Sequence, residues 1–273
     1  MIALTEIVRQ YPQWMQKPGF YDQMVKEYLH HHMLRLLFSG KHSANISFLG
    51  GTALRYFYGI KRFSEDLGFD CFNLTRESFI EMTGMVEKGL RKQGYEVIIE
   101  DKKKHEELNA FRRIFVFPEL KYRLGISQQK EAKFFIKIEA EPHGFLYNPE
   151  IKTLNGFGVS TPVGTVPSGI LFSTKIAAAI NRKKDGDFYD VINLIDFLNP
   201  DFSYLNYRCK ISNPEMLKKS LLKAAEERKL ETRKVYDCEH ILFEKNDLEK
   251  LRTFSTYINN FDFGRFGCNL YNI

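Results

Sequence analysis

Two stretches of the sequence decide the fold: FLGGTALR at residues 48–55 and RFSEDLGFD at residues 62–70. The first predicts a short strand, a glycine turn and a helix that begins near Thr52, because Gly-Gly interrupts an apolar run before a helical pattern starts. The second predicts a basic turn that leads into another strand at residues 67–72. A glycine turn beside an acidic strand is an arrangement with which proteins hold a triphosphate next to metal-binding carboxylates.

The glycine turn itself predicts a phosphate-binding site. Gly50 and Gly51 leave no side chain between their backbone N–H groups and a triphosphate, and a helix that begins near Thr52 directs its partial positive end to the same anion. We therefore predict that Gly50, Gly51 and Thr52 bind a nucleotide. Gly-Gly-Thr alone is a weak signal, because any strand-to-helix turn can contain glycine, and the acidic segment that follows strengthens it.

Acidic and polar residues after the turn predict a metal site. Asp66 is the expected principal ligand of a magnesium ion, which prefers carboxylate and phosphate oxygens and offsets the charge that develops in phosphoryl transfer. Ser64 is expected to contact the triphosphate. Arg62 has two equal interpretations, a cationic clamp on the nucleotide or a solvated charge in the turn. Asp70 shares a strand face with Asp66 but lies ~13 Å away, whereas paired metal ions lie ~3.5–4 Å apart, so Asp70 is assigned a supporting role only.

The rest of the chain predicts a sheet followed by helices. A helix is predicted at residues 19–38, and another begins at Thr75 as its N-cap and ends near residue 93. Further strands are predicted at residues 95–100, 112–117, 120–124 and 134–141, and further helices at residues 171–182, 188–198, 214–229 and 246–257. Residues 142–169, rich in glycine, proline and threonine, are predicted to connect the two halves. The expected fold is α+β, with N-terminal helices and a mixed sheet in residues 1–165 and a mainly helical domain in residues 166–273.

The composition sets only broad limits on function. A formal net charge of +6 over 273 residues suits an anionic partner such as RNA or a nucleotide, although many proteins without such partners are equally basic. No apolar run is long enough to span a bilayer, and the N-terminal segment has an early acid and no basic flank. We therefore expect no signal peptide, no membrane partner and a cytoplasmic location. The three consecutive histidines at residues 30–32 are expected to be structural. Successive side chains on a helix point about 100° apart, so the three rings do not converge on one metal ion.

Two further groups of charged residues extend the candidate site. Glu139 alternates with apolar residues and shares a face with Glu141, which predicts either a functional acid or an exposed acidic edge. Lys175 and Arg182 are seven residues apart on one predicted helix. Asp187 and Asp190 are three apart on the next helix. A lysine that reaches phosphate, with an aspartate that orients it or activates the nucleophile, would complete the site; a salt-bridge network between adjacent helices is the alternative.

Taken in order, these landmarks resemble a known family. The Gly50-Gly51-Thr52 turn, RFSED at residues 62–66, Lys175 in TKIAA, and Arg182 with DFYD at residues 187–190 resemble the AbiEii/AbiGii-type nucleotidyltransferases of abortive-infection systems. The resemblance implies a polymerase-β-like nucleotidyltransferase core, a helical C-terminal domain, and use of a nucleoside triphosphate with Mg²⁺. Some members are toxins of toxin–antitoxin systems and some nucleotidylate the acceptor end of tRNA. The expected acceptor is therefore RNA, tRNA in particular, or a protein hydroxyl, and an antitoxin protein is an expected partner.

The resemblance also implies roles for individual residues. Asp66, Lys175 and Asp187 are implied as catalytic, and Arg182 as nucleotide-binding. Glu141 is implied as a second metal ligand. Supporting positions are Glu139, Asp190 and Asp70.

The sequence departs from the family pattern at two places. The second aspartate expected two residues after Asp66 is Gly68, and the Gly-Arg expected before Asp187 is Asp185-Gly186. Three interpretations follow. The protein is an active Mg²⁺-dependent nucleotidyltransferase in which Glu141 or another acid compensates; or it has the same fold with impaired catalysis and binds nucleotide without turning it over; or it is a non-enzymatic protein that binds RNA or an antitoxin through its basic surface.

Overall fold

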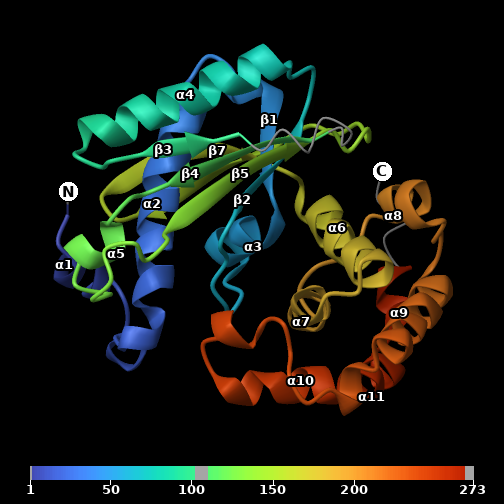
Figure 1. Ribbon diagram of the computed structural model, residues 1–273. Helices are drawn as coiled ribbons and strands as arrows, with labels where there is room; N and C mark the ends of the chain where they lie inside the picture. Colours follow the sequence, from blue (N-terminus) through green and yellow to red (C-terminus); the bar gives the residue numbers. More distant parts are fainter. Residues whose placement is uncertain (1, 102–109, 268–273) are drawn as a thin grey trace. The chain divides into compact units, whose positions relative to one another are not determined.

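The computed structural model, which describes residues 2–101 and 110–267, consists of two units (Figure 1). The first unit comprises Met1–Gly59, Phe63–Gly144 and Asn148–Val166, and the second comprises Ile60–Arg62, Phe145–Tyr147 and Pro167–Ile273. All strands of the described residues belong to the first unit, and the second is helical. The expected α+β class, with a mixed sheet and a mainly helical C-terminal part, is confirmed.

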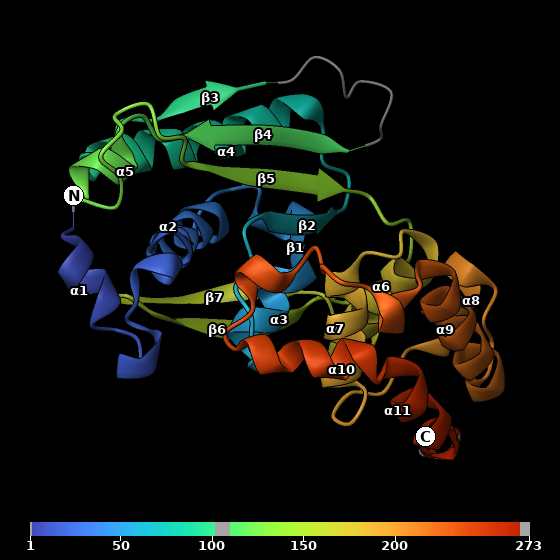
Figure 2. The same ribbon diagram turned by 60° about the horizontal axis from the view of Figure 1, so that its bottom comes forward.

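The strands of the first unit form one seven-stranded mixed sheet in the described part of the chain, in the order β3-β4-β5-β2-β1-β7-β6 (Figure 2). Their bounds are β1 Ile46–Leu49, β2 Leu67–Cys71, β3 Ile98–Glu100, β4 Phe111–Val116, β5 Phe135–Glu141, β6 Glu150–Gly156 and β7 Val159–Thr165. β2 runs parallel to β5, and β1 runs parallel to β7, while the other neighbours are antiparallel. The two strands that flank the glycine turn are therefore neighbours in the middle of the sheet.

Two long helices cover one face of this sheet. The helices of the first unit are α1 Leu4–Val8, α2 Tyr21–Phe38, α3 Gly50–Tyr58, α4 Arg76–Lys92 and α5 Leu120–Arg123. α2 and α4 pack closely at Gly89 of α4. A Cβ atom at this position would lie only 2.7 Å from the Leu36 side chain of α2. Phe38 of α2 packs on Phe69 of β2, with 6.2 Å between ring centroids. Thr75 accepts a hydrogen bond from the Ser78 N–H, so its predicted role as N-cap of α4 is confirmed.

Alternating side chains separate the two faces of the central strands. On β5, Ile136, Ile138 and Ala140 are fully buried. Lys137 and Glu139 alternate with them and therefore lie on the opposite face. The prediction that Glu139 shares its face with Glu141 is confirmed by this register. The covered face supplies the core of the unit, and the opposite face carries charge.

The second unit packs its helices around α6. Its helices are α6 Ser168–Asn181, α7 Asp185–Leu194, α8 Phe202–Cys209, α9 Pro214–Arg228, α10 Glu249–Arg252 and α11 Phe254–Asn260, coloured yellow to red in Figure 1. α6 contacts α7, α8 and α9, and large buried side chains such as Phe172, Phe188 and Phe254 fill the interior. Across residues 2–101 and 110–267, no helix combines the length and apolar character that crossing a membrane requires.

Several local predictions were wrong. Residues 120–123 form α5 in place of the strand predicted at 120–124, because the chain turns after β4 and Glu119, the N-cap of α5, adopts a left-handed conformation (φ 54°). Residues 142–169 contain the β6–β7 hairpin, and β7 pairs with β1, so this segment completes the sheet as well as connecting the halves. The helix expected at residues 246–257 is divided at Thr253 into α10 and α11, and α8 was not predicted. Only Ile98–Glu100 of the strand expected at residues 95–100 forms.

Candidate functional site

The glycine turn places the start of a helix at the end of a central strand. β1 ends at Leu49 and α3 begins at once with Gly50, whose φ of 87° is strained for any residue with a side chain. A Cβ atom at Gly50 would meet nothing within 4 Å, so backbone conformation rather than space requires glycine here. Leu49, the N-cap residue of α3, makes no capping hydrogen bond through its side chain to the first N–H groups of the helix. These N–H groups are the expected anion-binding groups.

Thr52 fixes the acidic segment to the start of α3. Its side chain is buried, and its hydroxyl donates a hydrogen bond to the Asp66 carbonyl oxygen at 2.5 Å. The same hydroxyl lies 2.8 Å from the Ser64 hydroxyl. Thr52 therefore holds the backbone of residues 64–66, and its predicted contact with a nucleotide stays a prediction.

His30 anchors the same segment from α2. Its Nε2 lies 3.2 Å from the Glu65 carbonyl oxygen, and because a carbonyl only accepts, Nε2 carries the proton. Its Nδ1 then accepts from the Tyr56 hydroxyl, at 3.0 Å. Burial, together with the nearby Lys26 and His31, lowers the pKa of His30 to about 3, so the ring is neutral. The side chain of Glu65 is held by Lys26 at 2.6 Å.

Charged side chains form a row on the open face of β2, β5 and β4. Asp66 Oδ2 lies 2.7 Å from Lys137 Nζ, and the same ammonium lies 3.4 Å from Glu139 Oε2. Arg112 of β4 donates two hydrogen bonds to Glu139, at 2.7 and 3.1 Å. Burial alone would raise the pKa of Glu139, but Arg112 and Lys137 outweigh it and lower that pKa below its ordinary value. Two carboxylates therefore converge on one ammonium group.

Gly68 lies inside this row. It pairs with Leu49 of β1 and with Glu139 of β5, two residues along the ladder from the Asp70–Glu141 pair. A Cβ atom at Gly68 would lie 3.5 Å from the Leu49 carbonyl oxygen and 3.7 Å from Leu49 Cδ1, which are ordinary van der Waals contacts. Neither the backbone nor the packing requires glycine at this position. A residue with a Cβ atom would meet no clash at that atom, and in the strand register it would stand beside Glu139.

The predicted acids on the strands differ in their surroundings. Asp70 is almost completely buried, and its Oδ1 accepts a hydrogen bond from the His143 N–H at 2.9 Å. Glu141 pairs in register with Asp70, while Glu139 pairs with Gly68. The register therefore brings Glu139, rather than Glu141, to the position nearest the missing second aspartate.

The carboxylates of this row fit one magnesium ion better than two. In the described part of the chain, no three His, Cys, Asp or Glu side chains gather closely enough to hold a metal ion by themselves. Asp66 and Glu139 do converge on a single cation, the Lys137 ammonium. Mg²⁺ is commonly held by one or two carboxylates together with water and substrate phosphates. Asp66 and Glu139 are thus a donor set that phosphate oxygens would complete.

The second unit contains a buried cluster of charges on α6 and α7. Lys175 Nζ lies 2.8 Å from Asp190 Oδ2 and 3.4 Å from Asp187 Oδ1. Arg182, which follows α6 as its C-cap, donates to both oxygens of Asp187, at 2.6 and 2.7 Å. The three residues expected to act together, Lys175, Arg182 and Asp187, are therefore in contact. The salt-bridge network that was the alternative interpretation is present, and a role toward a nucleotide stays a prediction.

Arg62 belongs to this cluster. Both Nε and one terminal nitrogen of Arg62 donate to the carboxylate of Asp190, each at 2.7 Å, and both side chains are buried. Burial would raise the pKa of Asp190, but Arg62 and Lys175 outweigh it and hold that pKa below its ordinary value. Asp190 is thus an ionised centre between two cations. The solvated turn that was one interpretation of Arg62 is not what the structure shows.

Three residues of the first unit were not identified from the sequence: Lys137, Arg112 and His30 in its contact with Glu65. Lys137 and Arg112 sit on strands whose alternation was recognised, but only the register brings their charges to Asp66 and Glu139. His30 was treated as structural with its two neighbours. No local pattern links it to a carbonyl 35 residues away.

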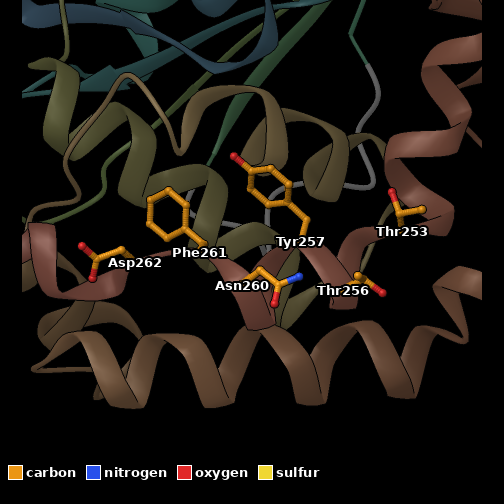
Figure 3. A pocket seen from close by; sticks show the side chains of 6 residues that line it. All are labelled: Thr253, Thr256, Tyr257, Asn260, Phe261 and Asp262. Carbon is orange, nitrogen blue, oxygen red and sulfur yellow. The ribbon is translucent and has the colours of Figure 1, made fainter.

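A separate surface hollow lies along α11 in the second unit (Figure 3). Its volume is about 430 Å³, and it is lined by Thr253, Thr256, Tyr257, Asn260, Phe261 and Asp262. None of the predicted site residues lines it. The rings of Tyr257 and Phe261 stack here, with centroids 6.2 Å apart.

Comparison with known proteins agrees with this architecture. Residues 35–255 match the family described as nucleotidyl transferase AbiEii toxin, type IV TA system. The structure is similar to MenT4, a nucleotidyltransferase toxin from Mycobacterium tuberculosis H37Rv, with a TM-score of 0.62 and 15% sequence identity over 97% of this chain and 93% of that chain. It is also similar to JHP933 from Helicobacter pylori, with a TM-score of 0.53 and 15% identity over 90% of this chain and 94% of that chain. A search of curated proteins finds no significant match.

Proposed function

The chain belongs to the AbiEii family of nucleotidyltransferase toxins of type IV toxin–antitoxin systems, and we propose that it transfers a nucleotide from a nucleoside triphosphate to a hydroxyl of the tRNA acceptor end. The net charge of +6 is compatible with a nucleic acid as the acceptor but does not by itself exclude a protein. The proposal includes an antitoxin protein as partner and a cytoplasmic location, where tRNA and nucleoside triphosphates occur.

One observation carries this proposal: a helix start that suits a triphosphate is joined by a hydrogen bond to the segment that bears Asp66. The Thr52 hydroxyl makes that bond at 2.5 Å. Because α3 directs its N–H groups and partial positive charge to this end, phosphate bound there lies beside the backbone of a candidate metal ligand. This bond holds the backbone of Asp66 against the start of α3, so the acidic segment and the candidate phosphate site keep a fixed relation to each other.

The proposed reaction is an in-line displacement at the α-phosphorus. The acceptor hydroxyl forms the new P–O bond and gives its proton to water, and the bond to the leaving pyrophosphate breaks. The N–H groups of Gly50 and Gly51 bind phosphate oxygens, with Ser64 as a further contact. Asp66 and Glu139 would hold Mg²⁺, which would offset the charge that develops on the phosphate oxygens. Glu141 was the expected second ligand, and the strand register favours Glu139 in its place.

The residues of the second unit have narrower proposed roles. Arg182, whose side chain is 55% exposed, is proposed to contact a nucleotide phosphate. Asp187 and the buried Lys175, which touch each other, are proposed to orient its charge. Arg62 and Asp190 are proposed to position Lys175 rather than to bind the nucleotide, because both are buried in their mutual ion pair.

A second candidate function has its own support. The same protein binds nucleotide without efficient turnover, because Gly68 supplies no carboxylate and Lys137 occupies the cation position between Asp66 and Glu139. The two candidate functions can be distinguished by adding a carboxylate at residue 68. The backbone there accepts a Cβ atom without strain.

The test compares the natural chain with Gly68→Asp. Each purified protein is incubated with Mg²⁺, total tRNA and one labelled nucleoside triphosphate at a time, and transfer of label is measured. We expect Gly68→Asp to transfer label at least ~10-fold faster than the natural chain, because a second carboxylate stabilises the charge of the transition state. Gly84→Asp, at a half-buried position of α4 where a Cβ atom would meet nothing within 4 Å, is the matched control and is expected to match the natural chain.

The outcomes distinguish the candidates. Measurable transfer by the natural chain supports the active enzyme, whereas transfer by Gly68→Asp alone supports a nucleotide-binding protein with impaired catalysis. Asp66→Asn in the Gly68→Asp background is expected to abolish transfer. If neither Gly68 form binds a nucleoside triphosphate with Mg²⁺, the proposed function is refuted; label on protein instead of tRNA refutes the proposed acceptor.

A further inference from the structure

The Lys137 ammonium occupies the position between two carboxylates that a metal ion would be expected to take. Its Nζ is 2.7 Å from Asp66 Oδ2 and 3.4 Å from Glu139 Oε2. All three side chains reach solvent, with 26% of Lys137, 44% of Asp66 and 25% of Glu139 exposed. The site therefore contains its own cation while remaining open to exchange.

The contacts of Arg112 explain why Lys137 is the cation that exchanges. Arg112 holds both oxygens of Glu139 through two hydrogen bonds, which fixes the orientation of that carboxylate. Lys137 contacts the two carboxylates through a single ammonium group on a flexible four-carbon side chain. This group can move away without breaking the hydrogen bonds between Arg112 and Glu139. Removing its charge leaves a fixed carboxylate on β5 and an exposed carboxylate before β2.

An ammonium group and a divalent cation compete for the same oxygens. Both are attracted to Asp66 and Glu139, and their mutual repulsion at short range prevents them from sharing one position. The loss of a carboxylate at Gly68 strengthens this competition, because the site has two acidic side chains rather than three to balance the charges.

We propose that Lys137 is the resting counter-ion of the Asp66–Glu139 pair and that a divalent cation must displace it to bind. Lys137 thereby lowers the affinity of the empty site for free metal, so that the metal enters with the nucleoside triphosphate, whose phosphates add the missing negative charge. This inference rests on the proposed function, since it concerns the metal site of the same reaction.

The test measures metal binding without nucleotide or turnover. The full chain and Lys137→Met are titrated with Mn²⁺, and free Mn²⁺ is followed by its electron paramagnetic resonance signal. We expect Lys137→Met to bind Mn²⁺ about five- to tenfold more tightly, because two carboxylates no longer have a competing ammonium. Lys137→Arg keeps the charge and is expected to bind no more tightly than the natural chain.

Lys152→Met is the matched control. Lys152 forms a comparable ion pair with Glu150 of the same unit, at 3.3 Å, with 30% and 42% of the two side chains exposed. Its loss is expected to change Mn²⁺ affinity by less than about twofold, since its carboxylate lies on β6. The gain in Lys137→Met is also expected to disappear when Asp66→Asn is added, which ties it to this site.

Equal or weaker Mn²⁺ binding by Lys137→Met overturns the inference, as does the absence of measurable binding by both proteins. Thermal unfolding checks that the variant is folded, and Lys137→Gln replaces it if Lys137→Met is not. The transfer assay is independent of this titration. Unchanged metal affinity together with nucleotide transfer by the natural chain leaves the proposed function standing and removes only the role of Lys137.

Discussion

Lowering the pH from 7 to 5 is expected to destabilise the sheet-containing unit by about 2 kcal/mol through His30 alone. Burial lowers the pKa of this histidine from 6.5 to about 3. The imidazolium is therefore much less stable in the folded state than in the unfolded chain. The contribution of His30 is fully present above pH 6.5 and is lost progressively as the pH falls toward 3.

The magnitude follows from the difference in proton binding. At pH 5 His30 is almost fully protonated in the unfolded chain, whereas in the folded protein it is still almost entirely neutral. The pH then lies about 1.5 units below the ordinary pKa, and at about 1.4 kcal/mol per unit the loss is about 2 kcal/mol. The Glu65 carbonyl and the Tyr56 hydroxyl contact the ring, so protonation also disturbs the segment that carries Asp66.

The assay is urea unfolding at pH 7 and pH 5 for the natural chain and His30→Gln. Glutamine is neutral at both values and offers one donor and one acceptor, which suits the same two partners. The natural chain is expected to lose about 2 kcal/mol more than the variant between the two pH values, whereas acid sensitivity from other groups is common to both. Losses that agree within about 0.5 kcal/mol would refute the reasoning.

Two further substitutions are expected to reduce stability by different mechanisms. Asp190→Asn should lower the free energy of unfolding by about 3 kcal/mol or more, because Arg62 and Lys175 then remain buried without their shared carboxylate. Thr52→Val should cost about 1–3 kcal/mol, because the Asp66 carbonyl loses its donor, and nucleotide affinity should fall with it. Both effects are measured by urea unfolding, with nucleotide binding as the second readout for Thr52→Val.

The controls for these substitutions are on the same elements or beside them. Asp196→Asn removes an exposed carboxylate that accepts from Tyr257 and is expected to cost less than about 1 kcal/mol. If Asp190→Asn lowers the free energy of unfolding by no more than Asp196→Asn does, the stability of the buried cluster does not depend on the charge of Asp190. Thr52→Ser keeps the hydroxyl and is expected to retain both stability and binding; a loss equal to that of Thr52→Val contradicts the role assigned to the hydrogen bond.

Local chemistry made much of the fold predictable. The Gly-Gly pair after an apolar run predicted the β1–α3 turn, and Thr75 predicted the start of α4, because both effects depend on residues that are close in sequence. The β6–β7 hairpin was missed although its strands pair with each other locally, because a segment rich in glycine, proline and threonine predicted a connection; β7 is also paired with the distant β1. Glu119 ended a strand pattern through its backbone conformation, which side-chain composition does not reveal.

The sequence by itself determined the family landmarks, the order of strands and helices around the glycine turn, and the two acids that share a face of β5. Only the tertiary structure decided that Glu139 lies beside Gly68, that Lys137 stands between Asp66 and Glu139, and that Arg62 is buried with Asp190. Periodicity assigns a side chain to a face, whereas strand register and helix packing determine which charges meet. Apart from Lys137 and Glu139, which are close in the sequence, those contacts join residues 71 to 128 positions apart, so they depend on long-range packing that no local pattern specifies.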